Sequence, residues 1–211
     1  MAARKFVFWE VDAQVDFMLP GGKLYVPGAE KILPNIARLV AAAQGNGVLL
    51  VSSACRHTPD DPEFRQFPPH CLRGSRGADI VAEGMTRDAV TVPPDASFQL
   101  PGDLLAHQQV LIEKQTLDVF SNPHTDAMVQ ELGDAKYVVF GVVTEYCVGL
   151  AAKGLLARGR QVAIVKDAME TLDANAGGRT TAELAALGAR VVTTDEAVAA
   201  VAAKAGEKAV S

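Results

Sequence analysis

The stretch that decides the fold is YVVFGVV at residues 137–143, which is apolar, aromatic or glycine throughout. A continuous run of this kind is typical of a strand buried on both faces, as in a parallel sheet. The runs VLLVSS at 48–53 and QVAIVK at 161–166 repeat the pattern. We therefore expect a parallel sheet with helices covering both of its faces.

Working outward from these runs, six segments are expected as strands, and most are followed by an amphipathic stretch. Alternating strands and helices imply right-handed crossovers and a doubly wound α/β sheet. The region Ala54–Ser75 lacks clear periodicity, and so long a loop inside a compact domain is usually functional. The predicted strands are Lys5–Val11, Gly47–Ser53, Gln109–Ile112, Lys136–Val142, Gln161–Val165 and Arg190–Thr193. The predicted helices are Ala29–Gln44, Thr125–Leu132, Cys147–Arg158, Arg179–Leu187 and Asp195–Lys204.

The composition limits the class of protein. The 211 residues are 49% hydrophobic and 21% charged, which suits one α/β domain spanning 1–211. No apolar run reaches the ~20 residues that a membrane-spanning helix needs. The net charge is −5 and the basic residues are scattered, which argues against a nucleic-acid partner. Three cysteines are too few for a disulfide framework, so we expect a cytoplasmic protein.

Reactive side chains stand at the carboxyl ends of the predicted strands, where ligands bind in such sheets. Asp12 ends the first strand, Cys55 and His57 follow the second, Lys114 follows the third, and Cys147 follows the fourth. Each residue taken alone has an ordinary structural explanation, such as a turn cap or a small buried side chain. Their joint occurrence at adjoining strand ends favours a catalytic site.

The motifs around these residues resemble those of the isochorismatase-like cysteine hydrolases, and among them the nicotinamidases most closely. The matching segments are VDAQVDF at 11–17, FPPHC at 67–71, Lys114, and GVVTEYCV at 141–148. The resemblance implies a three-layer α/β/α sandwich with a six-stranded parallel sheet. It also implies a homodimer or a homotetramer.

The resemblance implies a catalytic triad of Cys147, Asp12 and Lys114. In such a triad the cysteine sulfur attacks an amide carbonyl and the carboxylate carries the proton. Cys147 is expected to open a helix that begins near Tyr146, where the helix dipole favours a thiolate.

The resemblance further implies that the oxyanion donors are the backbone N–H groups of Val143 and Cys147. It places a cis peptide bond between Val142 and Val143. Aromatic side chains next to the motifs are expected to form an apolar slot that suits a flat ring or a small unsaturated acid. These pocket residues are Phe17, Phe67 and Tyr146.

Nicotinamidases carry a metal site in the region that corresponds to the long loop. The ligands implied here are Cys55, His57, Glu63 and His70. Cys55 departs from the family pattern, which has an aspartate at this place. Thiolate, imidazole and carboxylate ligands together suit Zn²⁺ better than Mg²⁺ or Ca²⁺, so zinc is the expected metal. The neighbouring Asp60 and Asp61 are expected as outer partners or substitute ligands.

Three functions stay open at this stage. The first is a nicotinamidase-like amidohydrolase that converts a small carboxamide to its acid and ammonia through a thioester at Cys147. The second is a metal-independent relative acting on a carbamoyl or linear amide, or an isochorismatase-like enzyme, although isochorismatases lack the cysteine nucleophile. The third is a binding protein that kept the fold without catalysis.

Two polar residues have no assigned role. Glu10 interrupts the first apolar strand, where it could meet a lysine or an arginine. His124 follows Asn122 on a predicted turn, and both side chains could reach the mouth of the pocket.

Overall fold

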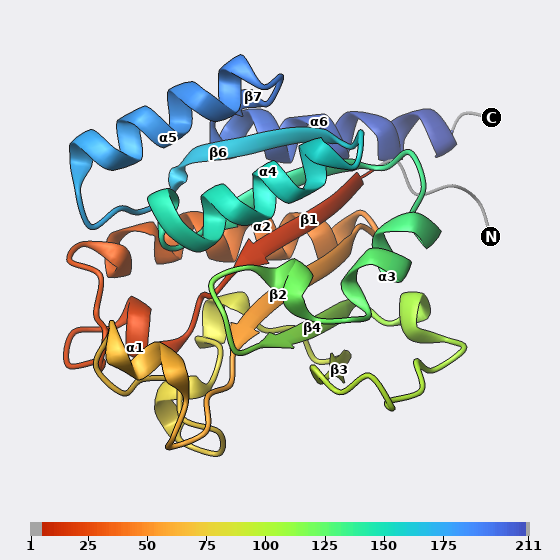
Figure 1. Cartoon of the computed structure of the whole chain (residues 1–211). Coiled ribbons are helices and arrows are strands. Elements are labelled where there is room, and N and C mark those ends of the chain that lie inside the picture. The colour runs from red at the N-terminus through yellow and green to blue at the C-terminus, as the bar shows by residue number, and fades with distance from the viewer. Residues whose placement is uncertain (1–5, 210–211) are drawn as a thin grey trace.

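Seven parallel strands form one sheet in the computed structural model, which describes residues 6–209 (Figure 1). The strand order is β3-β4-β2-β1-β5-β6-β7, so β1 lies between β2 and β5. The strands are β1 (Phe6–Val11), β2 (Leu49–Cys55), β3 (Ala89–Val92), β4 (Gln109–Lys114), β5 (Lys136–Gly141), β6 (Gln161–Met169) and β7 (Arg190–Val192).

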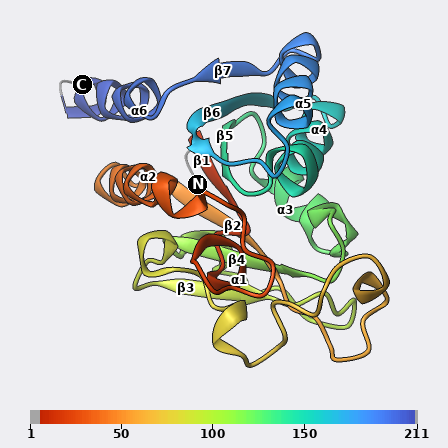
Figure 2. The same ribbon diagram turned by 90° about the vertical axis from the view of Figure 1, so that its left-hand side faces the viewer.

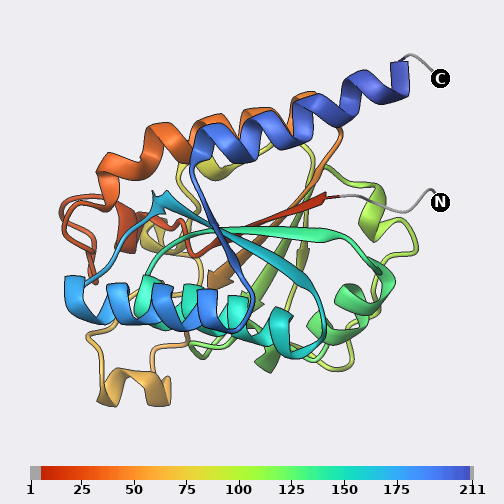
Figure 3. The same ribbon diagram turned by 90° about the horizontal axis from the view of Figure 1, so that it is seen from above.

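Helices cover both faces of the sheet. The α-helices are α1 (Val15–Met18), α2 (Leu33–Gly45), α3 (Thr125–Glu131), α4 (Gly149–Ala157), α5 (Ala174–Ala186) and α6 (Thr194–Ala209). In Figures 2 and 3, α2 and α6 lie together on one face, and α4 and α5 lie on the other. Two apolar clusters fill the space between the layers, one under α2 and α6 and one under α3, α4 and α5. The predicted three-layer α/β/α architecture is confirmed.

The predicted number of strands was wrong, because a seventh strand, β3, pairs with β4 at one edge of the sheet. This strand is only Ala89–Val92, and of its four residues only Val92 is buried. A short, largely exposed edge strand lacks the continuous apolar run that marked the other six. Its pairing depends on the neighbouring strand, which periodicity along the chain does not reveal.

The helices differ from prediction mainly at their starts. Helix α5 begins at Ala174, not at Arg179, because the Asp173 side chain accepts a hydrogen bond from Ala176 N at 2.6 Å and caps it. The pair Gly177-Gly178 had argued against a helix there. Gly177 is nevertheless required, since a Cβ atom at this position would lie 2.5 Å from Thr171 Oγ1. None of the helices described here combines the length and apolar character of a membrane-spanning segment.

Glu10 is fully buried in β1, and no lysine or arginine pairs with it among the described residues. Its Oε2 accepts a hydrogen bond from Ser52 Oγ at 2.7 Å, and Gln109 Nε2 donates to the same hydroxyl at 2.8 Å. Its Oε1 has no hydrogen-bond partner in the described part of the chain and lies against Gly84. Burial raises the pKa of Glu10 to about 8, so the residue is a neutral acid at pH 7.

Candidate active site

The three predicted catalytic side chains come together at the carboxyl end of the sheet. Lys114 Nζ lies 2.9 Å from Asp12 Oδ2 and 3.6 Å from Cys147 Sγ. All three residues are buried. A buried ammonium group is tolerated only where opposite charge and hydrogen-bond acceptors surround it, and Asp12 supplies the charge.

Asp12 is oriented by its departure from β1. Its φ angle of 49° turns the chain out of the strand. Ser53, on the adjacent β2, donates from its Oγ to Asp12 Oδ1 at 2.8 Å, and its carbonyl accepts from Asp12 N at 3.1 Å. The second carboxylate oxygen is thereby directed at Lys114. The sequence motifs did not indicate this role for Ser53.

Cys147 lies in an irregular turn, Thr144–Val148, and helix α4 starts only at Gly149. Tyr146 has non-helical angles, with φ −118° and ψ −105°. Because Tyr146 is the one residue of this turn with non-helical angles, and Val148 and Gly149 have helical angles, Cys147 opens the helical backbone that continues into α4, as expected. The kink directs Cys147 into the sheet end, where it is buried, and leaves Tyr146 at the surface.

The peptide bond between Val142 and Val143 is cis, as the family resemblance implies. Val142 N donates to Val11 O at 2.9 Å, and Thr144 N donates to Glu170 O at 2.8 Å. The N–H groups of the residues on either side of Val143 thus already donate to backbone carbonyls within the protein. The assignment of the Val143 and Cys147 N–H groups to an oxyanion stays a prediction.

The resting Cys147 is a thiol. Burial raises its pKa well above the usual range, and the lowering effect of the nearby Lys114 ammonium does not compensate. Contact with the Asp12 carboxylate raises the pKa further. The expected effect of the helix dipole is thus outweighed. Burial opposes the charge of Lys114 too, but the adjacent Asp12 carboxylate outweighs burial and raises the Lys114 pKa, so this residue stays an ammonium group.

Cys55 contacts the triad directly. Lys114 Nζ donates to Cys55 Sγ at 3.0 Å, and the same sulfur lies 3.8 Å from Asp12 Oδ2. Gln14 fixes the Cys55 backbone, because its Oε1 accepts from Cys55 N at 2.7 Å and its Nε2 donates to Cys55 O at 2.8 Å. Burial, followed by the charge of Asp12, raises the Cys55 pKa to about 12.

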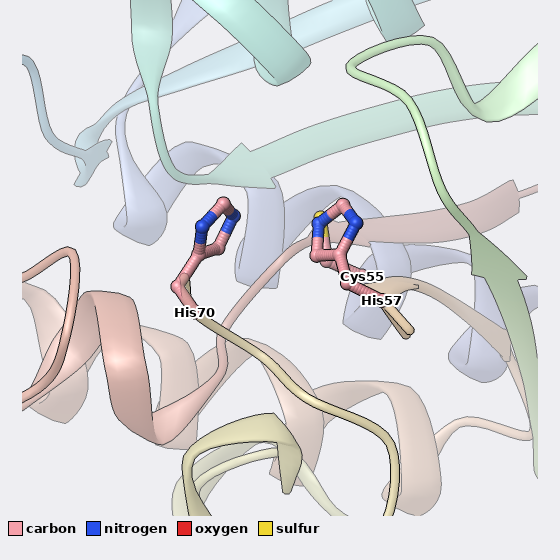
Figure 4. Close-up of side chains that lie close together, drawn as sticks. All are labelled: Cys55, His57 and His70. Atoms are coloured by element: carbon pink, nitrogen blue, oxygen red, sulfur yellow. The ribbon is translucent and has the colours of Figure 1, made fainter. Parts of the chain in front are cut away.

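The predicted metal ligands also converge. One donor atom each from Cys55, His57 and His70 lies within 4.8 Å of the others, and all three residues are buried (Figure 4). Glu63, on the short 3₁₀ turn Pro62–Arg65, lies beside this group. Its Oε1 lies 3.8 Å from Nε2 of His57 and 3.8 Å from Nε2 of His70.

The histidine hydrogen bonds fit a metal site. His57 Nδ1 lies 2.9 Å from Asp61 Oδ2, which matches the outer role predicted for Asp61. His70 Nδ1 donates to Pro68 O at 2.8 Å, since a carbonyl only accepts. Both Nε2 atoms therefore remain available as ligands, and that of His57 is buried without a hydrogen-bond partner among residues 6–209. Such fixed second-nitrogen contacts are characteristic of metal-binding histidines.

A cavity with about 430 Å³ of empty space opens between the triad and the predicted ligands. The three predicted aromatic residues, Phe17, Phe67 and Tyr146, all line it. Sequence reasoning missed the aliphatic part of the wall, because those residues come from loops without a motif. They include Leu24, Val26, Leu117 and Leu172.

Asn122 and His124 do not line this cavity. Asn122 Nδ2 donates to Val92 O at 3.2 Å and to Glu113 O at 2.9 Å, so it ties strand ends together. His124 Nε2 lies 2.8 Å from Asp95 O. Both side chains anchor loops, so of the two roles open to them, a turn or the pocket mouth, the structure supports the turn.

Comparisons with known proteins show the family and the fold. The isochorismatase domain profile matches residues 8–92 and 84–196. A probable inactive nicotinamidase of Arabidopsis thaliana is 23% identical over 147 residues, which span 65% of this chain and 66% of that protein. A maleamate amidohydrolase of Pseudomonas putida is 26% identical over 166 residues, covering 78% and 71% respectively. The crystal structure of a Pyrococcus horikoshii pyrazinamidase in complex with zinc superposes with a TM-score of 0.73 at 25% identity, covering 90% of this chain and 99% of that one.

Proposed function

The chain belongs to the isochorismatase domain family, and on this premise we propose that it is an amidohydrolase that converts a small carboxamide, nicotinamide or a similar compound, to its acid and ammonia. One observation carries the proposal, namely the contact of a single buried ammonium, Lys114 Nζ, with both Asp12 and Cys147. An acid, a base and a nucleophile at one cavity are the groups that amide hydrolysis requires.

In the proposed reaction the Cys147 sulfur attacks the amide carbon while Asp12 takes the thiol proton. Asp12 then delivers this proton to the departing nitrogen, so that ammonia leaves and a thioester remains on Cys147. A water molecule gives a proton to Asp12 and attacks the thioester, which releases the acid and restores the thiol. Proton transfer during attack suits a thiol whose pKa is raised by burial.

Lys114 and two backbone donors complete the chemistry. Lys114 holds the Asp12 carboxylate beside the sulfur and balances the negative charge that moves between them. We assign the backbone N–H groups of Val143 and Cys147 to the oxyanion. Loss of one such donor typically lowers turnover by ~10²–10³-fold.

We also propose that Cys55, His57, Glu63 and His70 hold a divalent metal, with Zn²⁺ favoured by the thiolate and imidazole donors. A bound zinc ion would offer a Lewis-acid position for a ring nitrogen of the substrate. The aromatic residues Phe17, Phe67 and Tyr146 then flank the ring and hold its carboxamide toward Cys147.

A metal-independent hydrolase of a linear or carbamoyl amide is the second candidate. It is supported by the similarity to a maleamate amidohydrolase. An isochorismatase-like reaction is disfavoured, because Cys147 occupies the nucleophile position. A non-catalytic protein, as the name of the plant relative suggests for that protein, is disfavoured by the assembled triad. The predictions of a homo-oligomer and of a cytoplasmic location remain part of the proposal.

Ammonia release decides between these candidates. The purified protein, with its metal content measured, is incubated with nicotinamide and with linear primary amides. We expect release from nicotinamide that stops on chelation and in Cys147→Ala, and persists in the control Cys71→Ala. Activity on linear amides alone, indifferent to chelators, would shift the assignment to the second candidate. No release from any amide would contradict both.

A further inference from the structure

The cavity at the triad offers no free positive charge to a substrate. Its lining residues include the carboxylates Asp12 and Glu63 but no lysine or arginine. The nearest cation, Lys114, has three N–H groups, and these face Asp12, Cys55 and Cys147. A further negative group in the cavity would therefore have no unsatisfied cation to pair with.

The groove next to the cavity is also lined by acidic side chains. An open groove with about 1430 Å³ of empty space shares Glu63, Phe67 and Leu117 with the cavity, so the two adjoin. Its acidic lining residues are Asp60, Asp61, Glu63 and Asp118, and no basic residue lines it.

Two arginines in this region are paired elsewhere. Arg56 Nε lies 3.3 Å from Glu113 Oε1, and Arg73 Nη1 lies 3.4 Å from Glu113 Oε2. Neither arginine lines the cavity or the groove. The linings of the cavity and of the groove thus carry carboxylates without a lysine or an arginine, which disfavours the binding of anions there.

The metal site does not change this balance. If a divalent ion binds the four predicted ligands, the Cys55 thiolate and the Glu63 carboxylate neutralise its two charges. The Asp12–Lys114 pair is itself neutral overall. A substrate carboxylate would still lose its hydration on entering a site that has no net positive charge. The free-energy cost of this desolvation is much larger than that of burying a neutral group.

We infer that this site selects carboxamides without negative charge and rejects carboxamides that bear a carboxylate, including maleamate. This inference rests on the proposed function, because it assumes that the cavity is the amide site. It separates the substrate class of this chain from that named for its Pseudomonas putida relative.

A matched pair of substrates tests the charge selection. Maleamide and maleamate share one carbon skeleton, but maleamide has a second neutral amide where maleamate has a carboxylate. We expect kcat/KM for maleamide to exceed that for maleamate by about a hundredfold or more, given the desolvation of an unpaired carboxylate. Equal values, or a preference for maleamate, would overturn the inference while leaving the amidase proposal intact.

A variant at the rim provides the gain-of-function arm. Leu172 lines the cavity and is 47% exposed, so a long polar side chain fits there without core disruption. We expect Leu172→Arg to raise the maleamate-to-maleamide ratio of kcat/KM about tenfold, and the uncharged control Leu172→Gln to leave it unchanged. A similar rise in both variants would contradict selection by charge.

Alkylation provides a readout that does not need catalysis. Iodoacetamide is neutral and iodoacetate is anionic, and both label a thiol by displacement of iodide. Their rates at Cys147, followed by peptide mass spectrometry, are each divided by the rate with glutathione. We expect a relative preference for iodoacetamide of about tenfold or more at low salt, and a smaller preference as salt rises.

The same assay separates the two proposals. We expect Asp60→Asn combined with Asp118→Asn to increase the relative rate of iodoacetate by a few fold, because two negative charges are removed from the groove that adjoins the cavity. If the protein lacks amidase activity but still reacts faster with iodoacetamide, the proposed function is contradicted and the charge selection is supported. Equal relative rates for the two reagents would overturn the selection even in an active amidase.

Discussion

Lys114 is the residue on which the candidate site depends most. Its ammonium group has three protons and three partners, two of them sulfur atoms and one a carboxylate. A buried cation with all its donors committed fixes the relative positions of these partners. The family resemblance predicted two of the contacts, to Asp12 and Cys147. The third, to Cys55, follows from the replacement of an aspartate by cysteine in the metal motif.

Ser53 offers a test of how Asp12 is oriented. Ser53→Ala removes the 2.8 Å hydrogen bond to Asp12 Oδ1 and frees the carboxylate to rotate away from Lys114. Loss of one such bond is worth about 1.5 kcal/mol, so we expect kcat for amide hydrolysis to fall about tenfold. Initial rates of ammonia release measure this. The control Ser52→Ala, whose side chain faces Glu10, should keep kcat within about twofold.

Glu10 gives the protein a predictable pH dependence of stability. The pKa of Glu10 is about 8 in the folded protein, against a reference value of 4.5. Between these values the unfolded chain has lost the proton and the folded protein has kept it. The stabilisation is therefore complete below about pH 4.5 and declines as pH rises toward 8, by up to about 1.4 kcal/mol per pH unit.

Urea unfolding of wild type and Glu10→Gln at pH 5, 6.5 and 8 measures this effect. Glutamine keeps the shape of the neutral acid but cannot ionise, so we expect the free energy of unfolding of wild type to fall relative to the variant as pH rises. Parallel pH profiles for the two proteins would show that Glu10 does not titrate in this range.

At the scale of elements, the junction from β5 to α4 determines where the nucleophile lies. Gly141 ends β5 with a φ angle of 120°, and a Cβ atom there would stand 2.1 Å from Val11 O. The close approach of β5 to β1 thus requires glycine. It brings the turn that carries Cys147 next to Asp12, which follows Val11 in the chain.

We expect Gly141→Ala to lower the free energy of unfolding by about 2–4 kcal/mol and to abolish most activity. The control Gly133→Ala also has a positive φ, 60°, but a Cβ atom there meets nothing within 4 Å. Gly133→Ala should lower the free energy of unfolding by about 1 kcal/mol, because only the strained backbone conformation opposes the new side chain. Denaturant unfolding monitored by circular dichroism compares the two, and equal losses would argue against the close contact.

Sequence reasoning located the buried strands well and their borders less well. Continuous apolar runs such as 137–143 are decided locally, because burial on both faces requires them. The edge strand β3 was missed because its pairing with β4 is a tertiary effect. The start of α5 was missed because Gly177 is retained for contact with Thr171, against its helix propensity.

At the scale of the whole molecule, the predicted ligands link the end of β2 to the long loop that follows it, all within residues 55–70. Cys55 ends β2, and both Glu63 and His70 lie in the long loop. A metal ion bound by them would tie the loop to the sheet. Since ligands stabilise the state that binds them, zinc at a hundred times its dissociation constant should add about 2.7 kcal/mol.

We therefore expect Zn²⁺ to raise the Tm of the metal-free protein by about 5–10 °C in differential scanning fluorimetry. His70→Ala should lose this shift. His107→Ala, which changes a histidine paired with Asp88 far from the site in sequence, should retain it. A zinc-induced shift of equal size in all three proteins would show that the ion binds elsewhere.

The site as a whole was predictable only as far as its motifs reach. Asp12, Lys114, Cys147, His57 and His70 stand at strand ends or in motifs, so topology alone brings them to one edge of the sheet. The apolar wall formed by Leu24 and Leu172 comes from loops, whose paths depend on long-range packing. The sequence also could not predict that Cys147 is a thiol, because its pKa depends on how completely the folded chain excludes water from the sulfur.

The central position of β1 has a consequence for how the chain tolerates change. β2 and β5 flank this strand, and β4, β2, β1 and β5 are consecutive in the sheet. Substitutions in the edge strand β7 reach β5 only through β6, whereas a shift of β1 displaces Asp12 immediately. We therefore expect substitutions to be tolerated better in the edge strand β7 than in the central strand β1.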